Sequence, residues 1–202
     1  MTIIIGILGG IGSGKSAVGT MFEKLGAFLI DADLLAHAAL LEPEIIEQVR
    51  TAWGDKVLSE GAVDRRKLAA QAFSSREQIE RLNAIVHPRV IERVTHSIDL
   101  ASQAGKAVVL DAALLLEAGL GDICTTLVFV HAETEVRLER ALAGRGLSAD
   151  DLRQREKFQI ALDKKRSMAH HVIDNNKSEA FTSQQVSEIW DGLFSSRTEL
   201  ST

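Results

Sequence analysis

The chain alternates short apolar runs with longer stretches in which apolar residues recur every three or four positions. The short runs predict five strands, at 3–8, 27–30, 107–110, 126–130 and 171–173. The longer stretches predict helices, at 15–25, 33–104, 133–143, 149–168 and 179–194. Strands that alternate with helices form parallel sheets with helices on both faces. The pattern therefore predicts an α/β fold on a five-stranded parallel sheet.

One predicted connection is much longer than such a sheet needs. Residues 31–105 separate the second and third strands, whereas a crossover between parallel strands needs only about a dozen residues. Apolar residues in this segment keep a helical spacing, as Ile45, Val49 and Trp53 do. We therefore expect a helical substrate subdomain at 31–104, inserted at the carboxyl edge of the sheet, where ligands of open α/β folds bind.

The predicted helices carry recognisable end signals. Ser75 and Ser148 stand at N-cap positions, and Gly105 stands where a C′ glycine ends a helix. The dipeptide His87-Pro88 predicts that a helix restarts there, because proline suits the first helical position.

Composition narrows the classes of protein to which the chain can belong. It has 46% hydrophobic and 25% charged residues, as globular proteins do, and no apolar run approaches the roughly 18 residues of a spanning helix. The beginning of the chain shows no leader pattern, so we expect a cytoplasmic protein without a membrane partner. A net charge of −5 argues against nucleic-acid binding. The single cysteine, Cys124, is expected to be a buried thiol.

The strongest chemical signal is a GxxxxGK[ST] motif at residues 9–16, between the first strand and the first helix. Glycines let backbone N–H groups curl around phosphates, and the start of a helix favours negative charge. Lys15 is expected to reach the β- and γ-phosphates of a nucleotide, and the Ser16 hydroxyl to hold Mg²⁺. The predicted phosphate-binding residues are Gly10, Ile11, Gly12, Ser13, Gly14, Lys15, Ser16 and Ala17.

This P-loop alone is compatible with a GTPase switch, an ATP-driven motor or a small-molecule kinase. The NKxD motif of guanine recognition is missing, since residues 175–178 read NNKS. Asp111 ends a strand but is followed by Ala112 rather than by a glutamate that could activate water. A kinase is therefore favoured, and Asp111 either binds Mg²⁺ through water or caps a following helix.

A small-molecule kinase also needs a base for the acceptor hydroxyl, and two carboxylates follow the second strand directly. Asp33 is interpreted as the base in preference to a helix cap. Asp31 either orients a water bound to Mg²⁺ or caps the helix.

Residues 136–164 have the composition of a mobile lid, which leaves 1–30, 105–135 and 165–202 as the core. Arg140 either neutralises charge on the transferred group or lies on a solvated helix face. Arg137, and the basic run at 164–166, are interpreted as solvated helix faces.

Taken together, these pieces resemble the dephospho-CoA kinase family along nearly the whole chain. The segments that carry the resemblance are 9–16, 31–37, 61–68, 85–90, 115–117, Arg140 with Arg145, and 172–175. The resemblance implies that the ribose 3′-hydroxyl of dephospho-CoA is phosphorylated by ATP in an Mg²⁺-dependent reaction.

The resemblance also implies roles for particular residues. Asp33 would be the base, and Lys15 and Arg140 would stabilise the γ-phosphate. Residues of the acceptor site would be Leu8, Asp33, Arg65, His87 and Pro88. Asn175 would lie near the adenine of ATP.

Three positions depart from the pattern of the family. Leu8 stands in place of the usual Thr, Ala17 in place of a second Thr, and Ala113 in place of a Pro. Leu8 lies under the expected acceptor, so the lost hydroxyl could alter acceptor affinity.

Two alternatives to dephospho-CoA kinase activity stay open. One is another small-molecule kinase, of the nucleoside, nucleotide or shikimate type, and the other is an inactive nucleotide-binding module.

Overall fold

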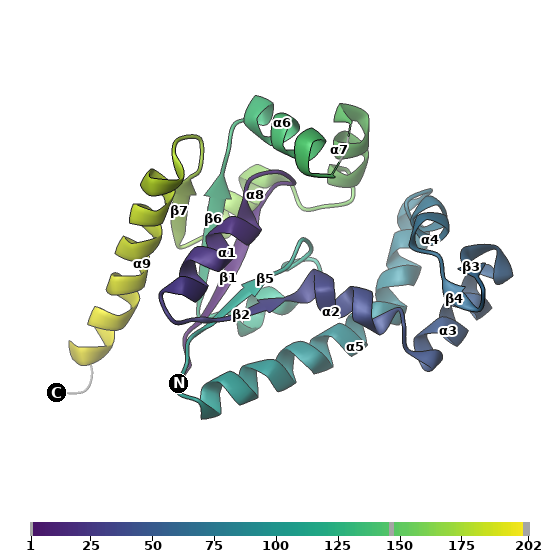
Figure 1. The fold of residues 1–202 in the computed structure, drawn as a ribbon, viewed down its shortest axis with the longest axis horizontal. Helices are drawn as coiled ribbons and strands as arrows, with labels where there is room; N and C mark the ends of the chain where they lie inside the picture. The colour runs from purple at the N-terminus through teal and green to yellow at the C-terminus, as the bar shows by residue number, and fades with distance from the viewer. Residues whose placement is uncertain (1, 146–147, 200–202) are drawn as a thin grey trace. The chain divides into compact units, whose positions relative to one another are not determined.

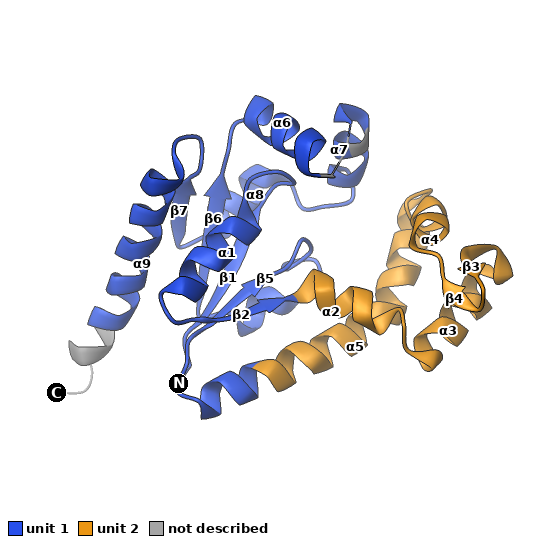
Figure 2. Ribbon diagram, in the orientation of Figure 1, with its two compact units in different colours: residues 1–31, 98–202 blue, residues 32–97 orange. Residues whose placement is uncertain are grey.

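The computed structural model describes residues 2–145 and 148–199, and the chain divides into two compact units (Figure 2). Unit 1 comprises residues 1–31 and 98–202, and unit 2 comprises residues 32–97. The subdomain expected at 31–104 overlaps unit 2 along nearly all of its length. Residues 146 and 147 of the expected lid, and the side chain of Arg145, lie outside the described part of the chain.

Unit 1 is built on a sheet of five strands, which are β1 (Ile4–Gly9), β2 (Phe28–Asp31), β5 (Val108–Asp111), β6 (Thr126–His131) and β7 (His171–Asp174). Their order across the sheet is β2-β5-β1-β6-β7, and each neighbouring pair is parallel (Figure 1). The predicted five-stranded parallel sheet is confirmed. All five carboxyl ends therefore lie at one edge of the sheet.

Helices cover the sheet of unit 1 on both faces. The helices α1 (Lys15–Lys24) and α9 (Glu179–Glu199) pack over an apolar cluster that includes the fully buried Ile5 and Phe22. The helix α8 (Leu162–Met168) contacts β1 and β6, and Figure 1 shows it behind the sheet, with α1 in front. Because both faces are covered, the central strands read as continuous apolar runs.

The expected lid contains α6 (Thr134–Arg145) and α7 (Ala149–Glu156), and the single helix predicted over 149–168 was wrong. The chain leaves the helical conformation between α7 and α8. There the N–H of Ile160 donates a hydrogen bond to Oε1 of Glu117 at 2.8 Å. Glu117 lies in the turns before the 3-10 helix η2 (Leu120–Ile123). A tertiary hydrogen bond therefore replaces the intrahelical one at this position.

Two basic side chains that were predicted to be exposed are buried instead. Lys165 is 2% exposed and Arg137 is 4% exposed. The ammonium nitrogen of Lys165 lies 3.0 Å from Oε1 of Glu117, and Nη1 of Arg137 pairs with Oε1 of Glu156. The interpretation as solvated helix faces was wrong because each cation has a carboxylate partner on another segment, and such pairing is what allows a charge to be buried.

Unit 2 is mainly helical. Its elements are α2 (Ala32–Ala39), α3 (Pro43–Trp53), η1 (Asp55–Val57), β3 (Leu58–Ser59), β4 (Ala62–Val63), α4 (Arg65–Ala72) and most of α5 (Arg76–Gln103). Its core contains Val49, Trp53, Val57 and Leu68. The Trp53 indole N–H donates to Oε1 of Gln78 at 2.6 Å, which satisfies the one polar atom of that ring.

The purely helical pattern predicted for 33–104 was wrong at residues 58–63. There β3 and β4 pair as an antiparallel hairpin, with Leu58 opposite Val63. The two residues of the turn, Glu60 and Gly61, have φ angles of 52° and 81°. Positive φ at both turn residues is typical of the tight hairpin turn that matches the twist of the strands.

The predicted restart of a helix at Pro88 was also wrong. Helix α5 runs without interruption from Arg76 to Gln103, with Pro88 inside it. Val86 and Val90, on either side of Pro88, are 7% and 6% exposed. Packing of these flanking residues outweighs the lost hydrogen bond and the crowding that a proline causes within a helix.

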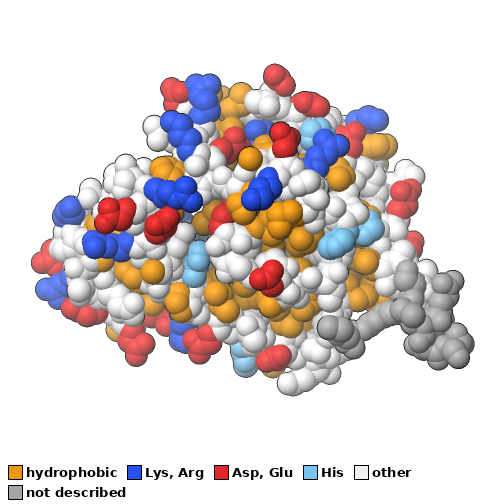
Figure 3. Space-filling model, turned by 180° about the vertical axis from the view of Figure 1, so that it is seen from behind, with side chains coloured by type: hydrophobic (Ala, Val, Ile, Leu, Met, Phe, Trp, Pro, Cys, Tyr) orange, Lys and Arg blue, Asp and Glu red, His pale blue; other side chains and the backbone are white. Residues whose placement is uncertain are grey.

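Other helix signals were correct. Oγ of Ser75 accepts a hydrogen bond from the N–H of Gln78 at 3.3 Å, and Gly105 has a φ of 67° at the end of α5. No helix in the described ranges is long and apolar enough to cross a membrane. On the face drawn in Figure 3, basic and acidic side chains are interspersed.

Candidate active site

The P-loop connects the central strand β1 to α1 at the carboxyl edge of the sheet. Gly12 and Gly14 have φ angles of 78° and 96°, a conformation that favours glycine. A side chain at Gly12 would collide with the backbone oxygen of Arg137, and one at Gly14 would collide with the side-chain amide of Asn175. These glycines are therefore required both by the backbone conformation and by the close approach of neighbouring segments.

Lys15 and Ser16 begin α1 and carry the polar groups of the motif. The ammonium group of Lys15 donates to the carbonyl oxygens of Gly9 and Gly10, at 3.1 Å each. The hydroxyl of Ser16 donates to Oδ2 of Asp111 at 2.7 Å. The P-loop cation and hydroxyl thus lie at the ends of the central strands β1 and β5.

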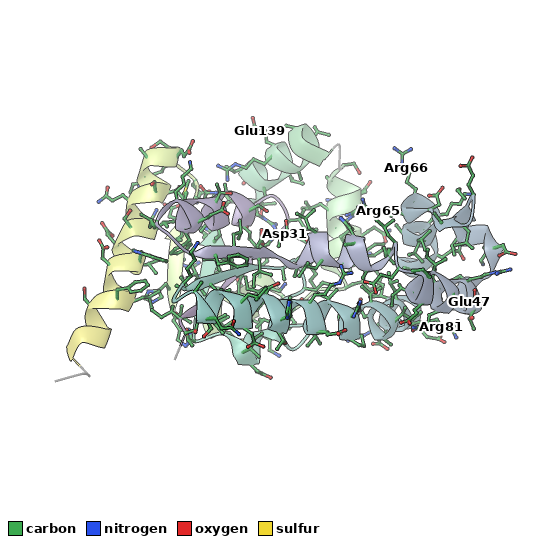
Figure 4. The ribbon with its side chains drawn as sticks, turned by 60° about the horizontal axis from the view of Figure 1, so that its bottom comes forward. Asp31, Glu47, Arg65, Arg66, Arg81 and Glu139 are labelled. Carbon is green, nitrogen blue, oxygen red and sulfur yellow. The ribbon has the colours of Figure 1, made fainter. Side chains whose placement is uncertain are left out.

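Asp111 is 7% exposed at the end of β5, and turns rather than a helix follow it. Its Oδ2 accepts the hydroxyl of Ser16, so the carboxylate lies beside the P-loop. In the register of the sheet, Asp31 of β2 lies directly opposite Asp111. Figure 4 labels Asp31 at the end of β2.

Two carboxylates and a hydroxyl at one sheet edge are oxygen ligands of the kind that Mg²⁺ prefers. The described part of the chain contains no group of three or more His, Cys, Asp or Glu residues that could hold a metal ion. These residues therefore fit an ion that keeps waters and substrate phosphates as its other ligands, as Mg²⁺ usually does.

Two buried polar atoms beside the P-loop have no hydrogen-bond partner among the described residues, Oγ of Ser13 and Nη1 of Arg140. Nη1 of Arg140 lies 3.8 Å from the position that a Cβ of Gly14 would occupy. Arg140 therefore faces the P-loop rather than a fully solvated helix face. An unpaired guanidinium N–H at this place suits an anionic ligand.

Ile11 anchors the P-loop to the expected lid helices. It is 7% exposed and packs in an apolar cluster with Ala141 of α6 and Leu152 of α7. Ala17, in contrast, is exposed in the first turn of α1. Leu8, the residue expected beneath the acceptor, is 2% exposed within β1 and so presents almost no surface.

Asn175 follows β7 and is 8% exposed. Its side-chain Nδ2 donates to the carbonyl oxygen of Ser13 at 2.7 Å, and its Oδ1 accepts from the hydroxyl of Thr182 at 2.8 Å. Both ends of the amide are thus bonded to protein groups. Asn175 therefore holds the P-loop backbone at Ser13. Its expected place near the adenine of ATP stays a prediction.

The remaining predicted residues belong to unit 2. Asp33 is exposed in the first turn of α2. Nη2 of Arg65, at the start of α4, lies 2.7 Å from Nε2 of His37 on α2. The neighbouring Arg66 points away from the helices of this unit (Figure 4). His87 is half-buried on α5, and Pro88 beside it is exposed.

Two partners of arginine side chains were missed at the sequence level. His37 had no recognisable ligand spacing, yet it pairs with Arg65. Glu156 belongs to no short motif, yet it binds the guanidinium of Arg137 beside the P-loop. No local signal could have identified these partners, because each pair joins segments that are brought together only by folding.

Comparison with known proteins bears directly on this site. The dephospho-CoA kinase family model matches residues 3–180. A dephospho-CoA kinase from Corynebacterium diphtheriae is 38% identical over 191 residues, which cover 93% of this chain and 95% of that protein. One from Bacillus licheniformis is 38% identical over 194 residues and covers 95% of this chain and 96% of its own length.

Among solved structures, TT1252 from Thermus thermophilus has a TM-score of 0.82 at 31% identity, and covers 95% of this chain and 97% of that one. The P-loop, the acidic strand ends and a match along nearly the whole length agree with one another. The chain therefore belongs to the dephospho-CoA kinase family.

Proposed function

We propose that this protein transfers the γ-phosphoryl group of ATP to the ribose 3′-hydroxyl of dephospho-CoA, which yields coenzyme A and ADP in the last step of coenzyme A biosynthesis. Family membership supports the choice of acceptor. The observation that carries the nucleotide half of the proposal is the hydrogen bond from Ser16 to Asp111 beside Lys15. The hydroxyl of Ser16, the carboxylate of Asp111 and the ammonium of Lys15 thus lie together at the loop that binds phosphates.

The P-loop holds the triphosphate through its backbone N–H groups and through Lys15. The Lys15 ammonium, which donates to two P-loop carbonyls, turns to the phosphate oxygens when they enter, because a charged acceptor forms the stronger hydrogen bond. Ser16 would hold Mg²⁺, with Asp111 or Asp31 binding it through water. When bound, Mg²⁺ neutralises phosphate charge.

Asp33 accepts the proton of the acceptor hydroxyl as the new O–P bond forms. It lies at the start of α2, two residues after Asp31, and it is exposed and so accessible to a substrate. Arg65, His87 and Pro88 belong to the acceptor site in this proposal. The cationic Arg65 suits the anionic phosphates of dephospho-CoA.

Arg140 stabilises the negative charge that spreads over the transferred group. Its buried, unpartnered Nη1 beside Gly14 supports this role, since a prearranged donor needs no reorganisation when charge develops. The segment 136–164 acts as the lid. Its closure excludes water, so that the alcohol rather than water receives the phosphoryl group.

The test is incubation of the protein with ATP, Mg²⁺ and dephospho-CoA, with coenzyme A and ADP measured by mass spectrometry. We expect both products, and none with shikimate or nucleosides as acceptors. Asp33→Asn should lower kcat by about 10²-fold or more, with ADP affinity unchanged, because only the proton acceptor is lost.

Asp191→Asn, an exposed change in α9, outside the P-loop and the lid segment, is the matched control and should leave kcat unchanged. Phosphorylation of another acceptor instead of dephospho-CoA would refute the proposed acceptor. Binding of ATP without transfer to any acceptor would indicate an inactive nucleotide-binding module. An unchanged kcat in Asp33→Asn would remove Asp33 from the mechanism.

A further inference from the structure

Arg137 lies against the P-loop although it belongs to neither the motif nor the proposed chemistry. Its side chain is 5% exposed, and its guanidinium fills the space directly over Gly10, so that a side chain at Gly10 would collide with it. Its own backbone oxygen closes the space over Gly12. One residue of α6 therefore covers two glycines of the P-loop.

The guanidinium of Arg137 joins three segments. Nη1 donates to the carbonyl oxygen of Ile11 at 3.5 Å, which is long for a hydrogen bond, and it forms an ion pair with Oε1 of Glu156. Ile11 is in the P-loop, Arg137 in α6 and Glu156 at the end of α7. The apolar cluster of Ile11, Ala141 and Leu152 joins the same three segments.

Arg140 follows Arg137 by three residues, so both side chains leave the same side of α6. Glu139, between them in sequence, is exposed and points outward (Figure 4). Whatever fixes Arg137 against residues 10–12 also fixes the distance of Arg140 from Gly14. A shift of about 1 Å in a group that stabilises the transition state can lower the rate about 10²-fold.

We propose that Arg137 and Glu156 form a positioning pair, which holds α6 and α7 against the P-loop and thereby places Arg140 at the transferred phosphoryl group. The catalytic part of this inference rests on the function proposed above. In this role neither residue needs to contact a substrate. The pair acts through the P-loop backbone and through Arg140.

An ion pair suits this task better than apolar contacts alone. Glu156 is 25% exposed and Arg137 is 5% exposed, so solvent screens the pair only partly. A planar guanidinium directs its N–H groups at fixed angles, whereas an apolar cluster permits sliding. Removal of Glu156 alone leaves a buried cation without its partner, which should loosen the contact at residues 10–12.

The test compares Glu156→Gln and Arg137→Gln with the double variant. Glu188→Gln is the matched control, because it removes an exposed carboxylate from α9, outside the P-loop and the lid segment. The measurements are kcat and KM for dephospho-CoA, ADP affinity, melting temperature, and hydrogen exchange of the backbone amides at 9–14.

For each single variant we expect kcat to fall about 10-fold or more, with KM for dephospho-CoA within about twofold of the wild type. Amide exchange at 9–14 should rise about 10-fold. The double variant should be no worse than the poorer single variant, because the pair acts as a unit. Glu188→Gln should match the wild type in every measurement.

A lower melting temperature with unchanged kcat and unchanged exchange at 9–14 would overturn the inference, since the pair would then only stabilise the fold. Additive losses in the double variant would overturn it as well. If the wild-type protein makes no coenzyme A, the proposed function fails. The exchange and ADP measurements then still decide whether the pair holds the P-loop.

Discussion

The buried ion pair between Lys165 and Glu117 gives a prediction about stability that does not depend on the reaction. Lys165 is 2% exposed and Glu117 is 13% exposed as side chains, and their charged atoms lie 3.0 Å apart. Oε1 of Glu117 also accepts from the N–H of Ile160 at 2.8 Å, whereas its Oε2 has no partner among the described residues. Loss of the ammonium group would therefore leave a buried carboxylate with a single hydrogen bond.

The perturbation is Lys165→Met, which keeps most of the length of the side chain and removes its charge. Breaking a buried pair by removing one partner typically lowers the free energy of unfolding by about 3–5 kcal/mol. For a chain of this size, 1 kcal/mol corresponds to about 2–4 °C in Tm, so we expect a decrease of about 6–20 °C. Glu117→Gln should cause a loss of similar size, because the buried ammonium then lacks its counter-ion.

The assays are urea unfolding, for the free energy, and thermal unfolding, for Tm, both followed by circular dichroism. Lys164→Met, at the exposed neighbouring position on α8, is the control and should stay within about 0.5 kcal/mol of the wild type. The double variant Glu117→Gln/Lys165→Met retains neither charge, so its loss should be smaller than the sum of the two single losses. The reasoning is refuted if Lys165→Met behaves like Lys164→Met, or if the two single losses simply add.

Three further predictions follow from single sites. Gly14→Ala should weaken ADP binding by about 10-fold or more in calorimetry, because φ is 96° there and the new methyl would displace Asn175; unchanged affinity would contradict this. Burial raises the pKa of the Cys124 thiol to about 12, from 9.0, so its reaction with a disulfide reagent at pH 8 should be about 10³-fold slower in the folded than in the urea-unfolded protein. Desolvation, and then the neighbouring His170, lower the pKa of His171 below 6.5. The unfolded chain therefore binds that proton more readily, and stability should fall as the pH drops below about 6.5; His171→Gln should flatten this dependence in unfolding curves at pH 5 to 7, and an unchanged slope would count against it.

Much of the fold could be predicted because its signals are local. The five strands are short apolar runs, of which the central β1, β5 and β6 are buried on both faces, and parallel pairing follows from the helices between them. The P-loop is recognisable because its glycines, Lys15 and Ser16 occur at a spacing that phosphate binding itself requires. Asp111 was a candidate because it ends an apolar run that predicts a buried strand.

Several failures arose because packing or a partner distant in sequence changed the local outcome. Pro88 continues a helix because Val86 and Val90 are packed on either side of it. The helix predicted across residue 160 breaks because Glu117 accepts the Ile160 N–H. A local pattern contains no information about such partners.

By itself, the sequence determined the class of fold, the phosphate-binding loop and the strand ends that carry its acidic partners, since strand and helix periods and the glycine spacing are properties of neighbouring residues. Only the tertiary structure decided the places of the charged side chains around that loop. Arg137 and Lys165 read as solvated in the sequence, yet both are buried, because Glu156 and Glu117 lie within ion-pair distance in the folded chain. A charge enters the interior only with a partner, and the fold supplies that partner.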